Sequence, residues 1–171
     1  QMNPIATVGY EGATPTAFDL ALLSADIELV VDVRAVAISR KFGFSKTVLS
    51  DRLRQLGMDY VHLRGLGDPK PGREAARAGD MPLFRAIFAK HMVTPEASSD
   101  LEKLLSLALE KRVALLCYEA DPEGCHRTIV ANGIAKLGNL SILHLRVESE
   151  RAANSGRSRT DNYSGESVAA A

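Results

Sequence analysis

Short apolar runs alternate with amphipathic stretches along nearly the whole length of this chain of 171 residues. The strand-like runs lie at 5–8, 28–33, 60–63, 113–116 and 141–147. The run at 28–33 is apolar enough to be buried on both faces, as the strands of a parallel sheet are. Strands that alternate with helices predict a three-layer, Rossmann-like α/β sandwich with about five mostly parallel strands flanked by helices.

Residues that favour helix starts precede two of the amphipathic stretches. Thr14 followed by Pro15 combines a preferred N-cap with a preferred first helical residue. Ser45 is a second candidate N-cap, and apolar residues at helical spacing follow it. These positions predict one helix after each of the first two strands.

The stretch between the third and fourth strands is harder to assign. A helix is expected at about 82–91, and Ser99 with Glu102 forms a capping box that predicts the start of another. The segment 65–80 is rich in Gly, Pro and charge, which is typical of a loop. Loops of this length in compact domains are usually functional or mobile, so we expect this one to close over a site.

Composition indicates a globular domain, with 46% hydrophobic and 25% charged residues. We expect a single α/β domain at 2–148, followed at 149–171 by a polar tail or arm that has too few apolar residues to form a core. No apolar run approaches the roughly 20 residues of a membrane span, and no signal peptide opens the chain. We therefore expect a cytoplasmic protein with no membrane partner, and its two Cys predict no disulfide framework.

Charge is unevenly distributed although the net charge is zero. Ten Lys or Arg residues face only four Asp or Glu residues in the stretch 34–77. Such a stretch could serve a nucleic-acid-binding module, with arginines of the tail as an additional arm. No aromatic platform for stacking bases accompanies these basic residues, which argues against that function.

Polar residues follow four of the predicted strands. They are Gly9-Tyr10-Glu11-Gly12, Asp32-Val33-Arg34, His62 and the segment Cys117–Arg127. Right-handed crossovers bring the carboxyl ends of parallel strands to one edge of a sheet, where open α/β sheets bind their ligands. We therefore expect these four groups to converge on one functional site.

The same segments carry a family resemblance. The motifs are VGYEG at Val8, VVDVR at Val30, SRKFGFSK at Ser39, YVHLRGLGDPK at Tyr60, and LLCYE at Leu115 followed by CHR at Cys125. Together they resemble the domain of unknown function family 488, over roughly Thr7 to Leu145. The resemblance implies the fold and a site at these motifs, and it leaves the reaction open.

Three arginines at the expected edge are candidates for holding an anion. Arg34, Arg40 and Arg127 could form a clamp, because guanidinium groups pair bidentately with phosphate or carboxylate. Alternatively, Arg127 pairs internally with Glu119 or Asp32 and holds the turns together. The further candidate ligand-binding residues are Tyr10, Asp32 and His62.

The candidate catalytic residues are Glu11, Glu119, His126 and Cys125. The carboxylates and the imidazole are suited to proton transfer, and Glu11, Glu119 and Asp32 could also hold magnesium with a bound phosphate. Cys125, at an expected helix start, could be a nucleophile with a lowered pKa. The alternative is that Cys125 is a small buried packing residue, and Cys117 is expected to belong to the core.

A zinc site formed by Cys117, Cys125, His126 and His62 is disfavoured by the spacing. Structural zinc sites usually show two closely and regularly spaced ligand pairs, whereas seven residues separate these two cysteines. Neighbouring Cys125 and His126 side chains would also diverge on a helix. The sequence therefore predicts no metal site, and it specifies no cofactor.

These observations favour a small cytosolic enzyme, or a ligand-binding domain, that acts on an anionic molecule such as a nucleotide or a phosphorylated metabolite. The second hypothesis is a nucleic-acid-binding module that uses the basic stretch 34–77. The third is a structural or regulatory protein without catalysis, in which the polar residues at the sheet edge only brace one another.

Overall fold

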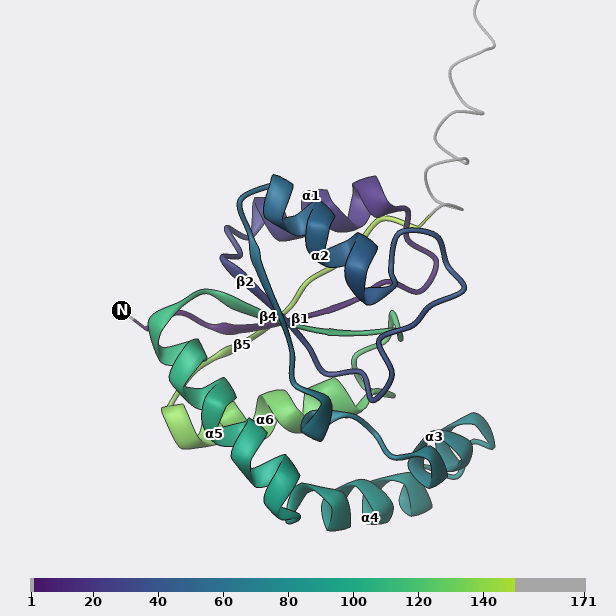
Figure 1. Ribbon diagram of the computed structural model, residues 1–171. Helices are drawn as coiled ribbons and strands as arrows, with labels where there is room; N and C mark the ends of the chain where they lie inside the picture. The colour runs from purple at the N-terminus through teal and green to yellow at the C-terminus, as the bar shows by residue number, and fades with distance from the viewer. Residues whose placement is uncertain (1, 150–171) are drawn as a thin grey trace, which may run out of the picture.

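Within residues 2–149, which the structure, a computed structural model, describes, five strands form one parallel sheet (Figure 1). The strands are β1 (Ile5–Gly9), β2 (Leu29–Asp32), β3 (Asp59–His62), β4 (Val113–Cys117) and β5 (Ile142–His144). Their order is β3-β2-β4-β1-β5, and each neighbouring pair is parallel. The predicted α/β class and the parallel sheet are confirmed.

Helices cover both faces of the sheet. Figure 1 shows α1 (Pro15–Ser24) and α2 (Lys46–Gln55) on one face, with α5 (Pro95–Glu110) and α6 (His126–Gly138) on the other. On the α5 and α6 side, α3 (Lys70–Arg77) and α4 (Met81–Met92) form a helical hairpin below the carboxyl edge of the sheet. A short 3₁₀ helix, η1 (Arg64–Leu66), joins β3 to this hairpin.

Two separate hydrophobic clusters lie on the two faces of the sheet. One includes Phe18 and Leu49 from the α1 and α2 layer, and the other includes Phe88, Leu104 and Ile134 from the α4, α5 and α6 layer. Strands β2 and β4 are buried at every position because they contribute alternate residues to both clusters. This double burial explains their continuous apolar sequences.

The helix-start signals were correct in position at the first two helices. Thr14 is the N-cap of α1, and its hydroxyl accepts a hydrogen bond from the Ala17 amide at 3.1 Å. Ser45 is the N-cap of α2, but its side chain bonds to the backbone of Ser39 instead of capping the helix. The Ser45 hydroxyl therefore holds the loop that precedes α2.

Three sequence-based expectations need correction. The segment 65–80 is not a loop, since all of α3 and part of η1 lie in it. Helix α5 begins at Pro95 with Thr94 as its N-cap, so the proposed capping box at Ser99 lies inside the helix. The last strand spans only Ile142–His144 of the predicted 141–147.

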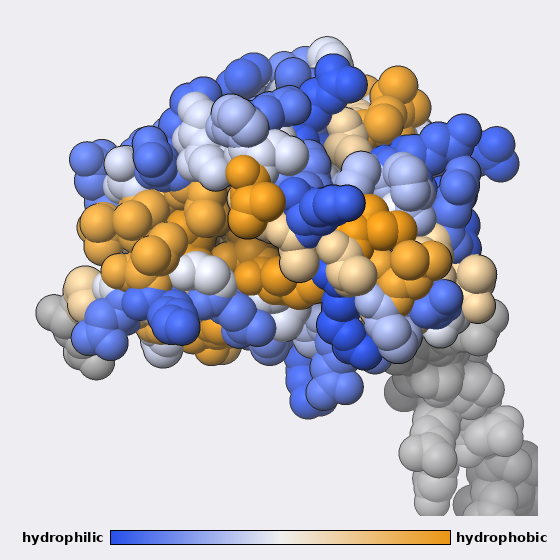
Figure 2. All heavy atoms as spheres, turned by 90° about the horizontal axis from the view of Figure 1, so that it is seen from below, coloured by the Kyte–Doolittle hydropathy of each residue, from blue (hydrophilic) through white to orange (hydrophobic). Residues whose placement is uncertain are grey.

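The α3–α6 side of the molecule exposes several apolar side chains among hydrophilic ones (Figure 2). Among them are Leu83, Val93, Leu109 and Leu137. Exposed apolar residues are normal on globular proteins, and no helix of residues 2–149 has the length and apolar character needed to cross a bilayer. The tail predicted at 149–171 lies outside the described residues apart from Ser149.

Candidate functional site

A cavity of about 630 Å³ opens at the carboxyl edge of the sheet, beside the ends of β1, β2 and β4. Its walls come from the segment after β2, from Asp68 with α3 and α4, and from the turn between β4 and α6. Tyr10 and Glu11, which directly follow β1, also line it. Open α/β sheets bind ligands at this edge, so the cavity is the candidate functional site.

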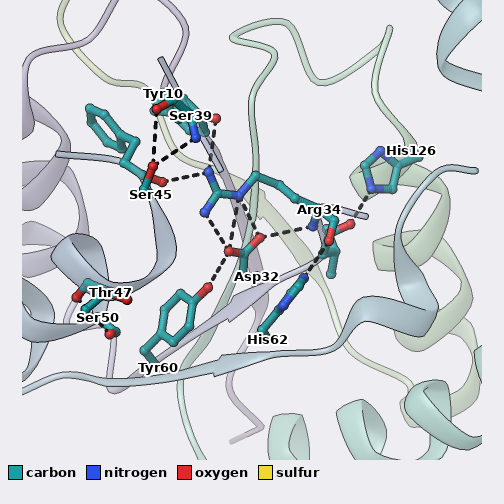
Figure 3. A network of polar contacts seen from close by, with 12 residues as sticks. Tyr10, Asp32, Arg34, Ser39, Ser45, Thr47, Ser50, Tyr60, His62 and His126 are labelled. Carbon is teal, nitrogen blue, oxygen red and sulfur yellow. Dashed lines mark hydrogen bonds and ion pairs between the residues drawn. The ribbon is translucent and has the colours of Figure 1, made fainter. Parts of the chain in front are cut away.

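A buried ion pair at the end of β2 organises one side of this edge (Figure 3). Asp32 is fully buried and Arg34 is 5% exposed, with a closest N–O distance of 2.7 Å. Arg34 Nε and Nη2 donate to the two carboxylate oxygens, in the bidentate geometry that suits arginine. Its Nη1 donates to the Tyr10 hydroxyl and to the Phe44 carbonyl. The pair therefore connects the loops that follow β1 and β2.

Two side chains from β3 complete this network. The Tyr60 hydroxyl donates to Asp32, and burial together with that carboxylate raises the pKa of Tyr60. The phenol therefore remains a hydrogen-bond donor at neutral pH. The His62 Nε2 atom lies 2.7 Å from the Arg34 carbonyl oxygen (Figure 3). His62 thus bonds to the backbone of the segment that follows β2.

Glu11 also connects two turns of the edge. Its side chain is exposed, and Oε2 accepts a hydrogen bond from the Ala120 amide at 3.0 Å. This bond joins the residue after β1 to the turn between β4 and α6. Tyr10, beside it, stacks on Phe44 with ring centroids 4.5 Å apart. Glu11 therefore lies on the cavity wall with a fixed carboxylate.

The three arginines expected to form a clamp occupy different environments. Arg34 is bound to Asp32, and Arg127 is 1% exposed, with its guanidinium donating to the backbone carbonyls of Glu119 and Ala120. Arg40 is exposed on the cavity wall. Two of the three guanidinium groups of the predicted clamp therefore already have internal acceptors, and the clamp stays a prediction. The acceptors of Arg127 are carbonyl groups, not the carboxylates considered in the alternative.

The turn between β4 and α6 gathers two thiols, an imidazole and a carboxylate. Glu119 Oε2 lies 3.1 Å from the Cys117 Sγ atom and 3.1 Å from the Cys125 Sγ atom. His126 Nδ1 lies 3.6 Å from the first sulfur and 3.9 Å from the second. The two sulfurs and this nitrogen all lie within 4.8 Å of one another.

The backbone at Cys125 explains why this cluster forms. Cys125 is the N-cap of α6, and its φ of −121° and ψ of 141° are extended, so the helix begins only at His126. An N-cap residue has non-helical geometry, so the divergence expected of neighbouring helical side chains does not apply. The expectation that Cys125 and His126 point apart was wrong for this reason.

Burial and the contacts within the cluster together determine the pKa values of its groups. It raises the pKa of the Cys125 thiol well above its ordinary value, and the neighbouring Cys117 adds to this effect. The lowered pKa that a nucleophile at Cys125 would require is therefore not found. Burial alone would raise the pKa of Glu119, but hydrogen bonds from both thiols bring it below its usual value. For His126, burial acts to lower the pKa, but the interactions with Cys125, the Val33 carbonyl and Glu119 together outweigh it and the pKa is raised.

Three charged residues on the cavity wall were not among those selected from the sequence. They are Asp68, Arg73 and Arg77. Asp68 is 5% exposed, burial raises its pKa, and its Oδ1 has no hydrogen-bond partner among residues 2–149. Arg73 and Arg77 lie four residues apart on α3, so they share one face of that helix. The four-residue spacing of these two arginines could have indicated a shared helical face. The loop predicted for 65–80 excluded that inference.

The segments that form this wall also carry the family relationship. The model of the family described as domain of unknown function DUF488 matches residues 14–134, which is more than half of the chain. The chain belongs to the DUF488 family. The span of this DUF488 match runs from the N-cap of α1 into α6, so it includes every cavity-lining residue except Tyr10 and Glu11. No curated protein and no solved structure matches the chain.

Three kinds of chemistry therefore meet at one cavity of this DUF488 protein. Exposed guanidinium groups are suited to binding anions, and carboxyl groups are suited to proton transfer. The two thiols and the imidazole of the cluster, from Cys117, Cys125 and His126, are groups that could hold a metal ion.

Proposed function

We propose that the cavity binds an anionic, nucleotide-like small molecule and that the protein acts on it as a small enzyme. The observation that carries this proposal is the pair of exposed arginines on the cavity wall, Arg40 and Arg77. Neither forms an ion pair within residues 2–149. Their guanidinium groups are therefore available to an incoming phosphate or carboxylate.

Apolar side chains on the same wall support a ligand that also has a flat or apolar part. Val36 is 53% exposed, Ile38 is 78% exposed, and Tyr118 is 47% exposed. Covering such surfaces releases water and favours binding, by about 25 cal/mol for each Å² of apolar area. A nucleotide combines a planar base with a phosphate, so it complements both parts of this wall. The cavity volume of about 630 Å³ lies within the range of small-molecule sites.

Carboxyl groups on the wall of the same cavity support proton transfer to or from such a ligand. Glu11 and Asp68 both line the cavity, one exposed and the other buried. Two carboxyl groups in unlike environments are suited to the separate roles of acid and base. Glu119 and His126, also on the wall, belong to the thiol cluster and bind its sulfurs.

Replacing Arg40 or Arg77 with alanine is expected to weaken the binding of a nucleoside triphosphate or diphosphate at least about tenfold. Hydrogen bonds to charged groups contribute about 1.5–3 kcal/mol each, which corresponds to a factor of ten or more. Isothermal titration calorimetry with ATP, ADP, adenosine and inorganic phosphate measures the change. Arg64→Ala is the matched control, because Arg64 is exposed but does not line the cavity. Unchanged nucleotide affinity in both cavity variants contradicts the proposal.

The same variants test the nucleic-acid hypothesis. Three arginines of the basic stretch are engaged in ion pairs, Arg34 with Asp32, Arg52 with Asp19 and Arg54 with Asp51, which leaves fewer of its guanidinium groups available for phosphates. A surface that uses the whole stretch predicts that Arg64→Ala weakens oligonucleotide binding as much as Arg77→Ala does. It also predicts a steep loss of affinity with salt, because neutralised phosphates release counterions. A gel-shift titration at two salt concentrations measures both effects.

A further inference from the structure

We propose that Cys117, Cys125, His126 and Glu119 form a binding site for one divalent metal ion of the zinc class. Two sulfur atoms and one imidazole nitrogen are the ligand set that tetrahedral zinc prefers, and a carboxylate oxygen is an accepted fourth ligand. This inference goes beyond the proposed ligand of the cavity and does not depend on it.

The two sulfur–nitrogen distances in the cluster are close to those of a tetrahedral site. With metal–sulfur bonds of about 2.3 Å and metal–nitrogen bonds of about 2.0 Å, neighbouring ligand atoms lie about 3.5–3.8 Å apart. His126 Nδ1 already lies 3.6 Å and 3.9 Å from the two sulfurs. The Glu119 oxygen lies 3.1 Å from each sulfur, but it is not among the atoms that all lie within 4.8 Å of one another. It must therefore move toward the imidazole to become the fourth ligand.

The imidazole of His126 is oriented for metal binding by a bond on its far side. Its Nε2 atom lies 2.7 Å from the Val33 carbonyl oxygen, which can only accept a hydrogen bond (Figure 3). Nε2 must therefore carry the hydrogen, and in the neutral ring the lone pair lies on Nδ1, which faces the two sulfurs. Metal-binding histidines typically hold their second nitrogen in this way. The ring of Phe88 packs against the imidazole, with centroids 5.4 Å apart.

A buried positive charge beside the cluster favours the metal-bound site, which carries a net negative charge. Two thiolates, a carboxylate and a divalent ion together carry one negative charge. The Arg127 guanidinium lies against the Glu119 carbonyl, its Nε atom is buried without a partner, and it has no ion pair within residues 2–149. Buried charges normally require a counter-charge, and the occupied site supplies one.

The site is enclosed but can be reached from the cavity. Cys117 is 4% exposed, Cys125 2% and His126 6%, so water is largely excluded from the ligand atoms. Cys117, Glu119 and His126 nevertheless line the cavity wall. An ion can therefore enter through the cavity, and it would lie within the wall that contacts the proposed ligand.

Cobalt(II) is the probe that tests the site, because its spectrum reports both thiolate ligands and coordination geometry. The full chain is reduced, freed of metal by chelation and titrated with cobalt in the absence of oxygen. We expect one ion per chain, with thiolate-to-cobalt absorption in the near ultraviolet and intense visible bands of a tetrahedral ion. Added zinc is expected to abolish these bands by displacement. Their absence in protein whose two thiols are free overturns the proposal.

Ligand variants assign the site. We expect Cys117→Ser, Cys125→Ser and His126→Gln each to weaken cobalt binding by more than about 100-fold, since loss of a second-shell partner alone costs 10–100-fold. Glu119→Gln is expected to shift the visible bands, because an oxygen ligand is altered while both thiolates remain.

The matched control is His91→Gln. His91 Nε2 also lies 2.7 Å from a backbone carbonyl, that of Gly65, but His91 is not a member of the thiol cluster. This variant is expected to keep the wild-type spectrum and affinity. Wild-type affinity in Cys125→Ser, or an equal loss in His91→Gln, contradicts the assignment. The wild-type spectrum reports the thiolates by itself, so a ligand variant that does not fold leaves the test intact.

Discussion

The variant Asp32→Ala is expected to lower the free energy of unfolding by about 3–5 kcal/mol, the range for breaking a buried ion pair. The substitution leaves the Arg34 guanidinium, which is 5% exposed, without its counter-charge. It also removes the acceptor of the Tyr60 hydroxyl and of the Arg34 amide. Urea denaturation at neutral pH, followed by far-ultraviolet circular dichroism, measures the loss.

Two further variants test whether the loss of stability comes from breaking a buried ion pair and not from removing any carboxylate. Asp51 pairs with Arg54 at 3.5 Å, and both side chains are about 60% exposed, so Asp51→Ala is expected to change stability by less than about 0.5 kcal/mol. Combining Asp32→Ala with Arg34→Met is expected to restore part of the loss, because no charge is then stranded. If Asp32→Ala unfolds at the same urea concentration as the wild type, this network does not brace the sheet edge.

Replacing Gly9 with alanine is the second substitution with a large expected effect. An added Cβ would lie 1.8 Å from the Glu119 carbonyl oxygen and 3.1 Å from an Arg127 nitrogen. The turn between β4 and α6 must then move away from β1, at the upper end of the about 1–3 kcal/mol that overpacking costs. Because Glu119 moves with that turn, the cobalt affinity proposed above is also expected to fall. Urea denaturation and cobalt titration measure the two effects.

Gly133→Ala is the control for this experiment. Gly133 lies inside α6, and an added Cβ there meets no atom within 4 Å. Alanine in a helix is more stable than glycine by about 0.5–1 kcal/mol, so this variant is expected to stabilise the protein. If Gly9→Ala retains wild-type stability and metal affinity, the close approach of β1 to the β4–α6 turn is not required.

The helix starts show what short sequence patterns can and cannot predict. Thr14-Pro15 correctly marks α1, and the same pair of residue types, Thr94-Pro95, marks the start of α5. The capping-box pattern at Ser99 predicted a later start for this helix, whereas the structure places Ser99 inside it. A capping box works only where the preceding chain is not helical, and a four-residue pattern does not contain that information.

Helix α3 is the element that local signals least favoured. Its sequence includes Pro71 and Gly72, which are typical of loops. Proline is tolerated in the first helical turn, and an added Cβ at Gly72 would lie 2.0 Å from Asp68 Oδ1, so the glycine permits a close approach. Apolar residues of α3 and α4 join the hydrophobic cluster below the sheet. Tertiary packing therefore supports a helix that propensity alone does not predict.

The alternation of apolar runs with helical stretches was sufficient to predict a parallel sheet and the edge where its polar turns meet, because parallel crossovers allow only that arrangement. The partners of each side chain depended on the strand order. Since β2 pairs with β4, the Val33 carbonyl after β2 lies beside His126 at the start of α6. The thiol cluster depended further on the extended backbone of Cys125. Such contacts depend on distances of a few ångströms between segments that are far apart in the chain. The spacing of residues along the sequence does not contain those distances.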